Sequence, residues 1–192
     1  MKKSSYFLVC VMSLFFVSAV FAQQQTFTID PSASSIAFAL TGTGHEVHGT
    51  FHVTSGAIHF DRSSHALSGS IVVSAASGDS GESSRDKKMR KDVLDAEHYA
   101  DVTFQPQSYK GTIAATGDST IQVSGLFTLH GASHAITVPM QIHIDSGKMT
   151  AKGSFIVPYV KWGLKNPSIF FLKVAKEVHI NMNFNGTVDA GQ

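Results

Sequence analysis

The histidines are the side chains of this 192-residue chain with the widest choice of chemistry, and there are ten of them. Imidazole is a common ligand of zinc and copper, and His45, His48 and His52 follow one another at spacings of three and four residues. On a strand, His48 and His52 share one face and the neighbouring apolar residues take the other, so these imidazoles are predicted to face solvent. The only cysteine, Cys10, belongs to a segment predicted to be removed, which leaves no thiolate for a structural zinc site. We therefore predict no metal site, with a site built from imidazoles alone as the alternative.

A second group with chemical potential is a run of five cations in the seven residues from Arg85 to Lys91. Such a run can bind a phosphate head group or an anionic membrane surface. Because Asp86, Asp92 and Asp95 lie in the same stretch, a solvated helix face is the favoured interpretation. The hydrolase motifs Gly-x-Ser-x-Gly and His-Glu-x-x-His are absent from the sequence, so we do not expect an enzyme.

The charge balance argues against nucleic acid as a partner. The chain has 15 Lys and Arg against 14 Asp and Glu. Lys2 and Lys3 belong to the segment predicted to be removed, which leaves 13 cations, 14 acids and a net charge of −1. A protein that binds nucleic acid normally has a clear basic excess, which this chain lacks.

Residues 1–22 have the organisation of a cleavable signal peptide. Lys2 and Lys3 form a positive end, an apolar run follows from Phe7 to Val17, and Ala22 precedes the predicted cleavage before Gln23. The alternative, an uncleaved anchor, is less favoured because the run is shorter than the ~20 residues of a spanning helix. We expect an exported protein, periplasmic or secreted, with one domain over residues 25–188. Without cysteine, that domain must be held together by its hydrophobic core.

The remainder of the chain has the pattern of strands. Apolar and polar residues alternate over residues 36–41, 51–54, 58–60, 121–130, 138–144 and 178–185. Turn residues separate these stretches, which predicts an antiparallel sandwich or barrel. Residues 83–94 are predicted to form a short helix, with Ser83 and Asp86 as a capping box. Residues 164–173 contain Asn166-Pro167 and are predicted to be a loop or a bent strand.

Several motifs resemble those of the YceI-like family. The opening Asp30-Pro31-Ser32-Ala33-Ser34-Ser35-Ile36-Ala37-Phe38 is similar to the first strand of that family. Its first hairpin is resembled by two motifs, Gly49-Thr50-Phe51 and Gly56-Ala57-Ile58-His59-Phe60-Asp61. Its charged helix is resembled by Arg85-Asp86 followed by Leu94-Asp95-Ala96-Glu97-His98-Tyr99. Gly125-Leu126-Phe127-Thr128-Leu129-His130-Gly131 resembles a later hairpin, and Trp162-Gly163 stands where an aromatic–glycine pair is usual.

The resemblance implies an all-β protein, an antiparallel eight-stranded, lipocalin-like up-and-down barrel with one short helix. It implies an exported binding protein that holds a long-chain amphiphile (a polyisoprenoid, a quinone, or a fatty acid or amide) for transport or storage, with no cofactor beyond this lipid or quinone ligand. Transient contact with a membrane surface and a homodimer are further expectations. One alternative is a small periplasmic enzyme or redox or stress factor acting on a quinone-like ligand. Another is a structural barrel with a filled core and a protein partner.

The predicted lipid-binding residues come from two sources. The apolar face of the strands, which a barrel turns inward, supplies Phe38, Leu40, Phe51, Val53, Phe60, Phe104, Phe127, Leu129, Met140, Ile142 and Phe155. The irregular aromatic stretch supplies Tyr159, Trp162, Phe170 and Phe171. Aromatic residues in such a loop can form a lid or mouth over a ligand, or can plug one end of the barrel. Alternation by itself does not separate a lined cavity from a packed core.

Overall fold

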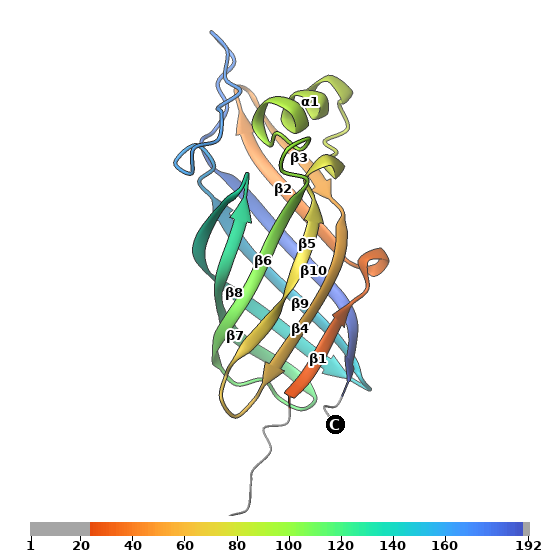
Figure 1. The fold of residues 1–192 in the computed structure, drawn as a ribbon. Coiled ribbons are helices and arrows are strands. Elements are labelled where there is room, and N and C mark those ends of the chain that lie inside the picture. The colour runs from red at the N-terminus through yellow and green to blue at the C-terminus, as the bar shows by residue number, and fades with distance from the viewer. Residues whose placement is uncertain (1–23, 190–192) are drawn as a thin grey trace, which may run out of the picture.

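The structure, a computed structural model, describes residues 24–189, and strands dominate it (Figure 1). The predicted signal peptide lies outside the described residues. The strands are β1 (Gln24–Ile29), β2 (Ser35–Gly42), β3 (His45–Phe51), β4 (Val53–Asp61), β5 (Leu67–Ser74), β6 (Asp101–Gly111), β7 (Gly117–Leu129), β8 (Ala132–Asp145), β9 (Lys148–Val157) and β10 (Val178–Asp189). Short helical segments are η1 (Pro31–Ala33), η2 (Ala75–Ser77), α1 (Ser83–Lys88) and η3 (Met89–Val93).

Eight strands close a ring in the order β1, β4, β5, β6, β7, β8, β9 and β10, and β10 pairs with β1 to complete it. β10 pairs with β1 through residues 186–189 and with β2 through residues 179–183, so β2 continues the strand position that β1 begins. β3 and β4 likewise share one strand position: β3 pairs with β2, β4 pairs with β1, and His52 separates the two. Neighbouring positions are therefore consecutive and antiparallel around the barrel. The predicted eight-stranded up-and-down barrel with one short helix is confirmed.

The period-two pattern places one side of each strand inside the barrel, and two bulges correct its phase. The pairing of β4 with β5 shifts register between Val53 and Ser55. A bulge adds one residue to one strand and so exchanges the faces to which odd-numbered and even-numbered residues point. In β4, Val53 before the bulge and Phe60 after it are therefore both buried, although one number is odd and the other even. A second shift in β6, between Pro106 and Ser108, changes parity in the same way.

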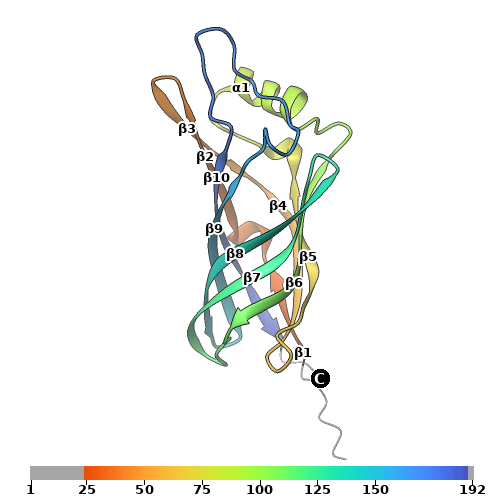
Figure 2. The same ribbon diagram turned by 90° about the vertical axis from the view of Figure 1, so that its left-hand side faces the viewer.

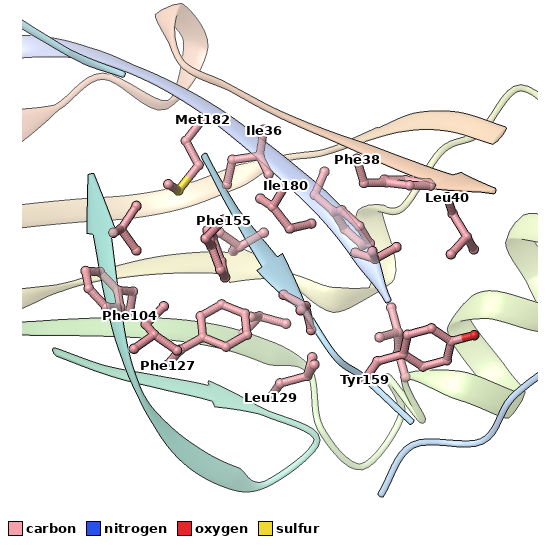
Figure 3. Close-up of a pocket in the computed structure, with 18 of the residues that line it drawn as sticks. Ile36, Phe38, Leu40, Phe104, Phe127, Leu129, Phe155, Tyr159, Ile180 and Met182 are labelled. Carbon is pink, nitrogen blue, oxygen red and sulfur yellow. The ribbon is translucent and has the colours of Figure 1, made fainter. Parts of the chain in front are cut away.

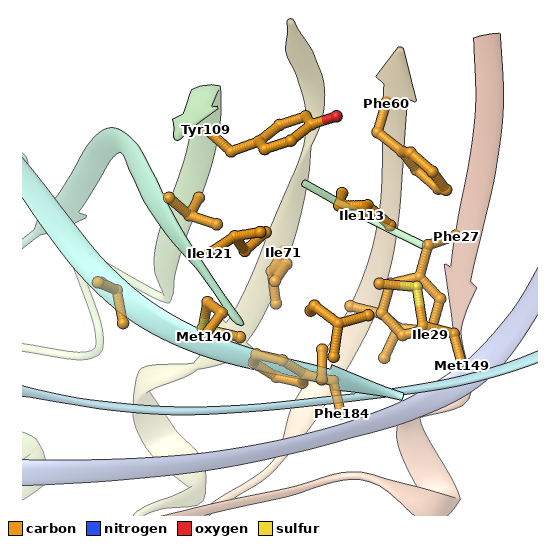
Figure 4. Packing of buried hydrophobic residues seen from close by; sticks show 14 of the residues in the cluster. Phe27, Ile29, Phe60, Ile71, Tyr109, Ile113, Ile121, Met140, Met149 and Phe184 are labelled. Atoms are coloured by element: carbon orange, nitrogen blue, oxygen red, sulfur yellow. The ribbon is translucent and has the colours of Figure 1, made fainter. Parts of the chain in front are cut away.

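One end of the barrel, called the base, is filled by side chains. Figure 4 shows Phe27, Phe60, Tyr109 and Ile113 converging there from separate elements, and all four are buried. Arg62 fastens the loop that carries Ile113, because its guanidinium donates to the carbonyl oxygen of Ile113 at 3.1 Å and to the side-chain oxygen of Gln25. The start of β1 and the end of β10, which are the two ends of the described chain, lie at this same end (Figure 1).

The opposite end carries the helix and two projecting segments (Figure 2). One is the β2–β3 hairpin, and the other is residues 165–176, called the mouth segment, which rises beyond that hairpin. The mouth segment has no strand of its own, and its Ile169 and Leu172 form a single antiparallel bridge. The prediction of a loop over residues 164–173 therefore agrees with the structure.

The helix differs from its predicted form at its first turn. The N-cap is Glu82, whose carboxylate accepts from the backbone N–H groups of Ser84 and Arg85, and not Ser83. Asp86, predicted to close a capping box, instead turns away from solvent, is 6% exposed, and accepts from the backbone N–H of Ser80 at 2.9 Å. Within residues 24–189 no helix is long and apolar enough to cross a membrane.

Candidate functional site

The barrel encloses a cavity of about 520 Å³ whose wall is almost entirely apolar (Figure 3). Every exposed residue in its lining lies at the end that carries the mouth segment, so the cavity reaches solvent there; this opening is called the mouth. The inward residues of β10 mark depth below it. These residues, called the β10 row, are Val178, Ile180, Met182 and Phe184. At about 3.4 Å per residue the row spans roughly 20 Å from the mouth to the base.

Most of the predicted lipid-binding residues lie together in this wall. Eleven of the fifteen line the cavity, and Figure 3 shows several of them facing one another across it. The eleven are Phe38, Leu40, Phe51, Phe60, Phe104, Phe127, Leu129, Met140, Ile142, Phe155 and Tyr159. Because Phe127 and Phe155 meet edge to face, with ring centroids 5.3 Å apart, the aromatic wall is itself a packed surface.

Four predicted residues do not line the cavity. Val53 is buried in the core beside the β4 bulge and does not contribute to the lining. Trp162 does not itself line the cavity: its ring stacks on His134 at 4.0 Å, lies 5.9 Å from the ring of Phe127, and packs against the buried cluster that includes Leu129. Phe170 and Phe171 are 91% and 92% exposed and point away from the barrel.

The alternating pattern contained further lining residues that the prediction omitted. The β10 row is one such set, and Ile36, Val123 and Ile136 also line the cavity. All of them lie on the apolar parity of their strands. The prediction selected only part of the apolar face and therefore left out several wall residues, including every one that β10 contributes.

Polar side chains gather at the mouth. Arg85 and Lys88 of α1 lie in the lining, as do Lys173 of the mouth segment, His45 of β3 and the acidic N-cap residue Glu82. The interpretation of the whole Arg85–Lys91 run as a solvated face is therefore wrong for Arg85 and Lys88, which are partly buried against the cavity. It holds for Lys87 and Lys91, which are exposed. The sequence does not show which side of the helix meets the barrel, so it could not separate the cations that face the cavity from those that face solvent.

Arg85 is held in place by the loop that precedes the helix. Its Nε donates to the hydroxyl of Ser80 at 2.7 Å, and its Nη2 donates to the carbonyl oxygen of Ser80 at 2.9 Å. The buried carboxylate of Asp86 accepts from the backbone N–H and the hydroxyl of the same serine. A cation with two fixed hydrogen bonds loses little conformational freedom when an anionic group approaches. Arg85 is therefore a preorganised positive group at the rim of an apolar cavity.

The mouth segment is tied to the barrel at its C-terminal end. The Tyr159 hydroxyl donates to the carbonyl oxygen of Ala175 at 2.7 Å, and burial raises the pKa of that hydroxyl. The backbone of Thr43, in the β2–β3 turn, donates to the carbonyl oxygen of Lys173 at 2.9 Å. The backbone of Lys173 donates in return to the Thr43 hydroxyl at 2.7 Å. Ile169 and Leu172, which precede these ties in the chain, reach the cavity lining.

The histidines are spread over several strands and turns, and of them only His45 lines the cavity. His48 and His52 are exposed, as their parity predicts. His98 meets Asp95 at 2.8 Å, and this hydrogen bond and charge raise the pKa of His98. Within residues 24–189 no three His, Cys, Asp or Glu side chains come together in a way that could hold a metal ion.

Comparisons with known proteins agree on one family. A family model described as the YceI-like domain matches residues 27–186. A UPF0312 protein of Vibrio parahaemolyticus is 33% identical over 122 residues, which is 61% of this chain and 62% of that protein. A UPF0312 protein of Vibrio campbellii is 33% identical over 108 residues, or 55% of each chain. The matches thus span less than two thirds of the length of these curated relatives.

Solved structures share the fold at lower sequence identity. BcnA of Burkholderia cenocepacia superposes with a TM-score of 0.67 at 22% identity, over 83% of this chain and 99% of that one. A polyisoprenoid binding domain from Saccharophagus degradans, implicated in plant cell wall breakdown, gives 0.63 at 14% identity, over 85% and 98%. The YCEI protein of Campylobacter jejuni gives 0.55 at 14% identity, over 96% and 98%. At these identities the likeness establishes the fold alone.

Proposed function

The chain belongs to the YceI-like family, and from this premise we propose that it is an exported binding protein that holds one long-chain amphiphile with the tail in the barrel and the head at the mouth. A polyisoprenoid, a quinone and a long-chain fatty acid or amide all have this form. The role is transport or storage, and it requires no covalent chemistry. Export is proposed on the sequence of residues 1–22.

The observation that carries the proposal is the division of the cavity into an apolar shaft and a polar rim. The β10 row and the walls around it offer a tail no polar partner, whereas Arg85, Lys88 and Lys173 stand at the mouth. Burying ten methylenes contributes roughly 8 kcal/mol before ordering costs. The volume of about 520 Å³ falls within the range of about 300–1,000 Å³ that is usual for small-molecule sites.

The fold neighbour from Saccharophagus degradans supports the same ligand class, since it is described as a polyisoprenoid binding domain. The unfilled interior speaks against the alternative of a structural barrel with a packed core. A long isoprenoid has more carbon than this volume encloses, so we expect such a ligand to leave part of its chain outside the mouth.

The test is to identify what the purified protein carries. The full chain is expressed with its leader, purified without detergent, and extracted with organic solvent for mass spectrometry. We expect about one apolar amphiphile per barrel, and its mass distinguishes an isoprenoid, a quinone and a fatty acid. An extract without lipid, together with failure of the stripped protein to bind added palmitate or ubiquinone by calorimetry, would contradict the proposal.

A further inference from the structure

The tip of the mouth segment is the most exposed apolar surface among the described residues. Ile169, Phe170, Phe171 and Leu172 follow one another and are 51%, 91%, 92% and 57% exposed. Backbone hydrogen bonds between Ile169 and Leu172, of 3.0 and 2.7 Å, close a tight turn with the two phenylalanines at its centre. The turn therefore projects both rings outward, and Figure 2 shows this segment rising beyond the β2–β3 hairpin.

The surroundings of the tip are cationic. Lys161, Lys165, Lys173 and Lys176 are all exposed, and Glu177 is the single acid in residues 161–177. Within the described part of the chain, none of these four lysines is within ion-pair distance of a carboxylate.

The opposite end of the barrel is mixed in charge. Its turns and strand ends carry Asp61, Asp118, Asp145 and Asp189 together with Arg62, Lys110 and Lys148. The excess of lysine in residues 161–177 has no counterpart there, so an anionic surface would attract the barrel through the mouth segment.

The size of the tip indicates which kind of surface it fits. Two phenylalanine rings bury about 300–500 Å², which is well below the roughly 800 Å² that each partner contributes to a stable protein–protein interface. Aromatic rings flanked by lysines are instead the composition of segments that lie in the head-group region of a bilayer.

We propose that the tip, residues 169–172, inserts into the surface of an anionic lipid bilayer and docks the barrel with its mouth against the membrane. Phe170 and Phe171 enter the head-group region, and the surrounding lysines contact the lipid phosphates. Since Ile169 and Leu172 also line the cavity, docking brings the apolar shaft to the bilayer surface. Docking does not depend on what the cavity holds; its use for taking up or delivering a ligand rests on the proposed function.

Vesicle flotation tests the proposal with two lipid compositions: phosphatidylcholine alone, and an equimolar mixture of phosphatidylcholine and phosphatidylglycerol. We expect the protein to float with the mixed vesicles, to bind phosphatidylcholine vesicles weakly, and to dissociate as salt is raised. The double variant Phe170→Ser/Phe171→Ser should lose at least about tenfold in affinity for the mixed vesicles. The matched control is Ile156→Ser, which removes an apolar side chain that is 48% exposed on β9, and it should bind like the unchanged protein.

The charge contribution has its own variant. Lys173→Gln/Lys176→Gln should weaken binding to the mixed vesicles by about fivefold per lysine and leave binding to phosphatidylcholine unchanged. Equal flotation of the unchanged protein and the phenylalanine variant would overturn the proposal. A dimer in solution that dissociates in that variant, without vesicle binding, would also overturn it and would assign the tip to self-association. Mass spectrometry of the ligand carried by the phenylalanine variant separates the docking proposal from the proposed function. If the variant keeps its ligand but no longer floats with vesicles, only docking has been lost. If neither the variant nor the unchanged protein carries a ligand, the proposed function is contradicted.

Discussion

Filling the cavity at half depth should shorten the tail that the barrel can hold, and Ile180 is the position at which to do it. Ile180 is the second member of the β10 row, lies opposite Phe155 and Phe38 on the neighbouring strands, and faces the lumen (Figure 3). Ile180→Trp places an indole across the shaft. Because the space beside Ile180 is unfilled, the larger ring should be accommodated without the cost of about 1–3 kcal/mol that accompanies overpacking of a closed core.

The magnitude follows from the cavity volume. At about 30 Å³ for a group the size of a water molecule or a methylene, 520 Å³ holds roughly 17 such groups. A block at Ile180 closes off the levels of Met182 and Phe184, about half of the shaft and roughly eight groups. Each methylene contributes between about 0.3 kcal/mol, with ordering costs included, and about 0.8 kcal/mol without them. A long chain should therefore lose at least about 2.4 kcal/mol, or roughly 60-fold in affinity.

The assay is calorimetric titration with straight-chain fatty acids of increasing length, from about eight to about eighteen carbons. In the unchanged protein, affinity should rise with each carbon and level off near roughly 17. In Ile180→Trp it should level off at about half that length. His179→Trp is the matched control, since it adds the same ring one residue earlier on the exposed face of β10. Met182→Trp, one level deeper, should level off between the two.

The same chain-length profile in Ile180→Trp, His179→Trp and the unchanged protein would refute the reasoning, because the tail would then not descend along the β10 row. An affinity independent of chain length in the unchanged protein would refute it as well. A large loss of thermal stability in Ile180→Trp alone would mean that the interior at this level is already packed.

Three further predictions concern the frame around the cavity. Tyr159→Phe removes the hydrogen bond to the Ala175 carbonyl oxygen and should cost about 1 kcal/mol locally, seen as roughly fivefold faster hydrogen exchange in the mouth segment and unchanged exchange in the barrel. Gly49→Ala places a methyl group against the backbone carbonyl oxygen of Asp79 and the ring of Phe38 and should lower the free energy of unfolding by about 1–3 kcal/mol in urea denaturation; an unchanged value would mean that both neighbours move aside freely. The pKa of His98 should lie above its ordinary value in an NMR titration and should fall when its aspartate partner is replaced by asparagine. Because that pKa is raised, the stability from this pair is fully present below the ordinary histidine pKa and disappears as pH rises through the raised value.

The sequence alone determined which residues could form the wall. Side chains on a strand alternate between two faces whatever the strand pairs with, so Phe38, Phe127 and Met140 could be assigned to the inside from local pattern. The short helix near Ser83 was equally local, because charge density and turn residues interrupt the alternation there. The resemblance of the motifs then predicted the closed eight-stranded ring.

Tertiary structure decided what the pattern leaves open. The bulges in β4 and β6 arise from pairing between strands, so the change of buried parity between Val53 and Phe60 depended on a neighbour that the local pattern does not contain. The position of Arg85 at the mouth depended on which face of α1 meets the barrel. Phe170 and Phe171 were predicted to bind lipid as part of a lid or mouth, and only the turn between Ile169 and Leu172 decides that their rings are exposed. That the interior is hollow at all follows from the ring circumference and the summed volume of the inward side chains, and both are properties of the closed barrel and not of any single strand.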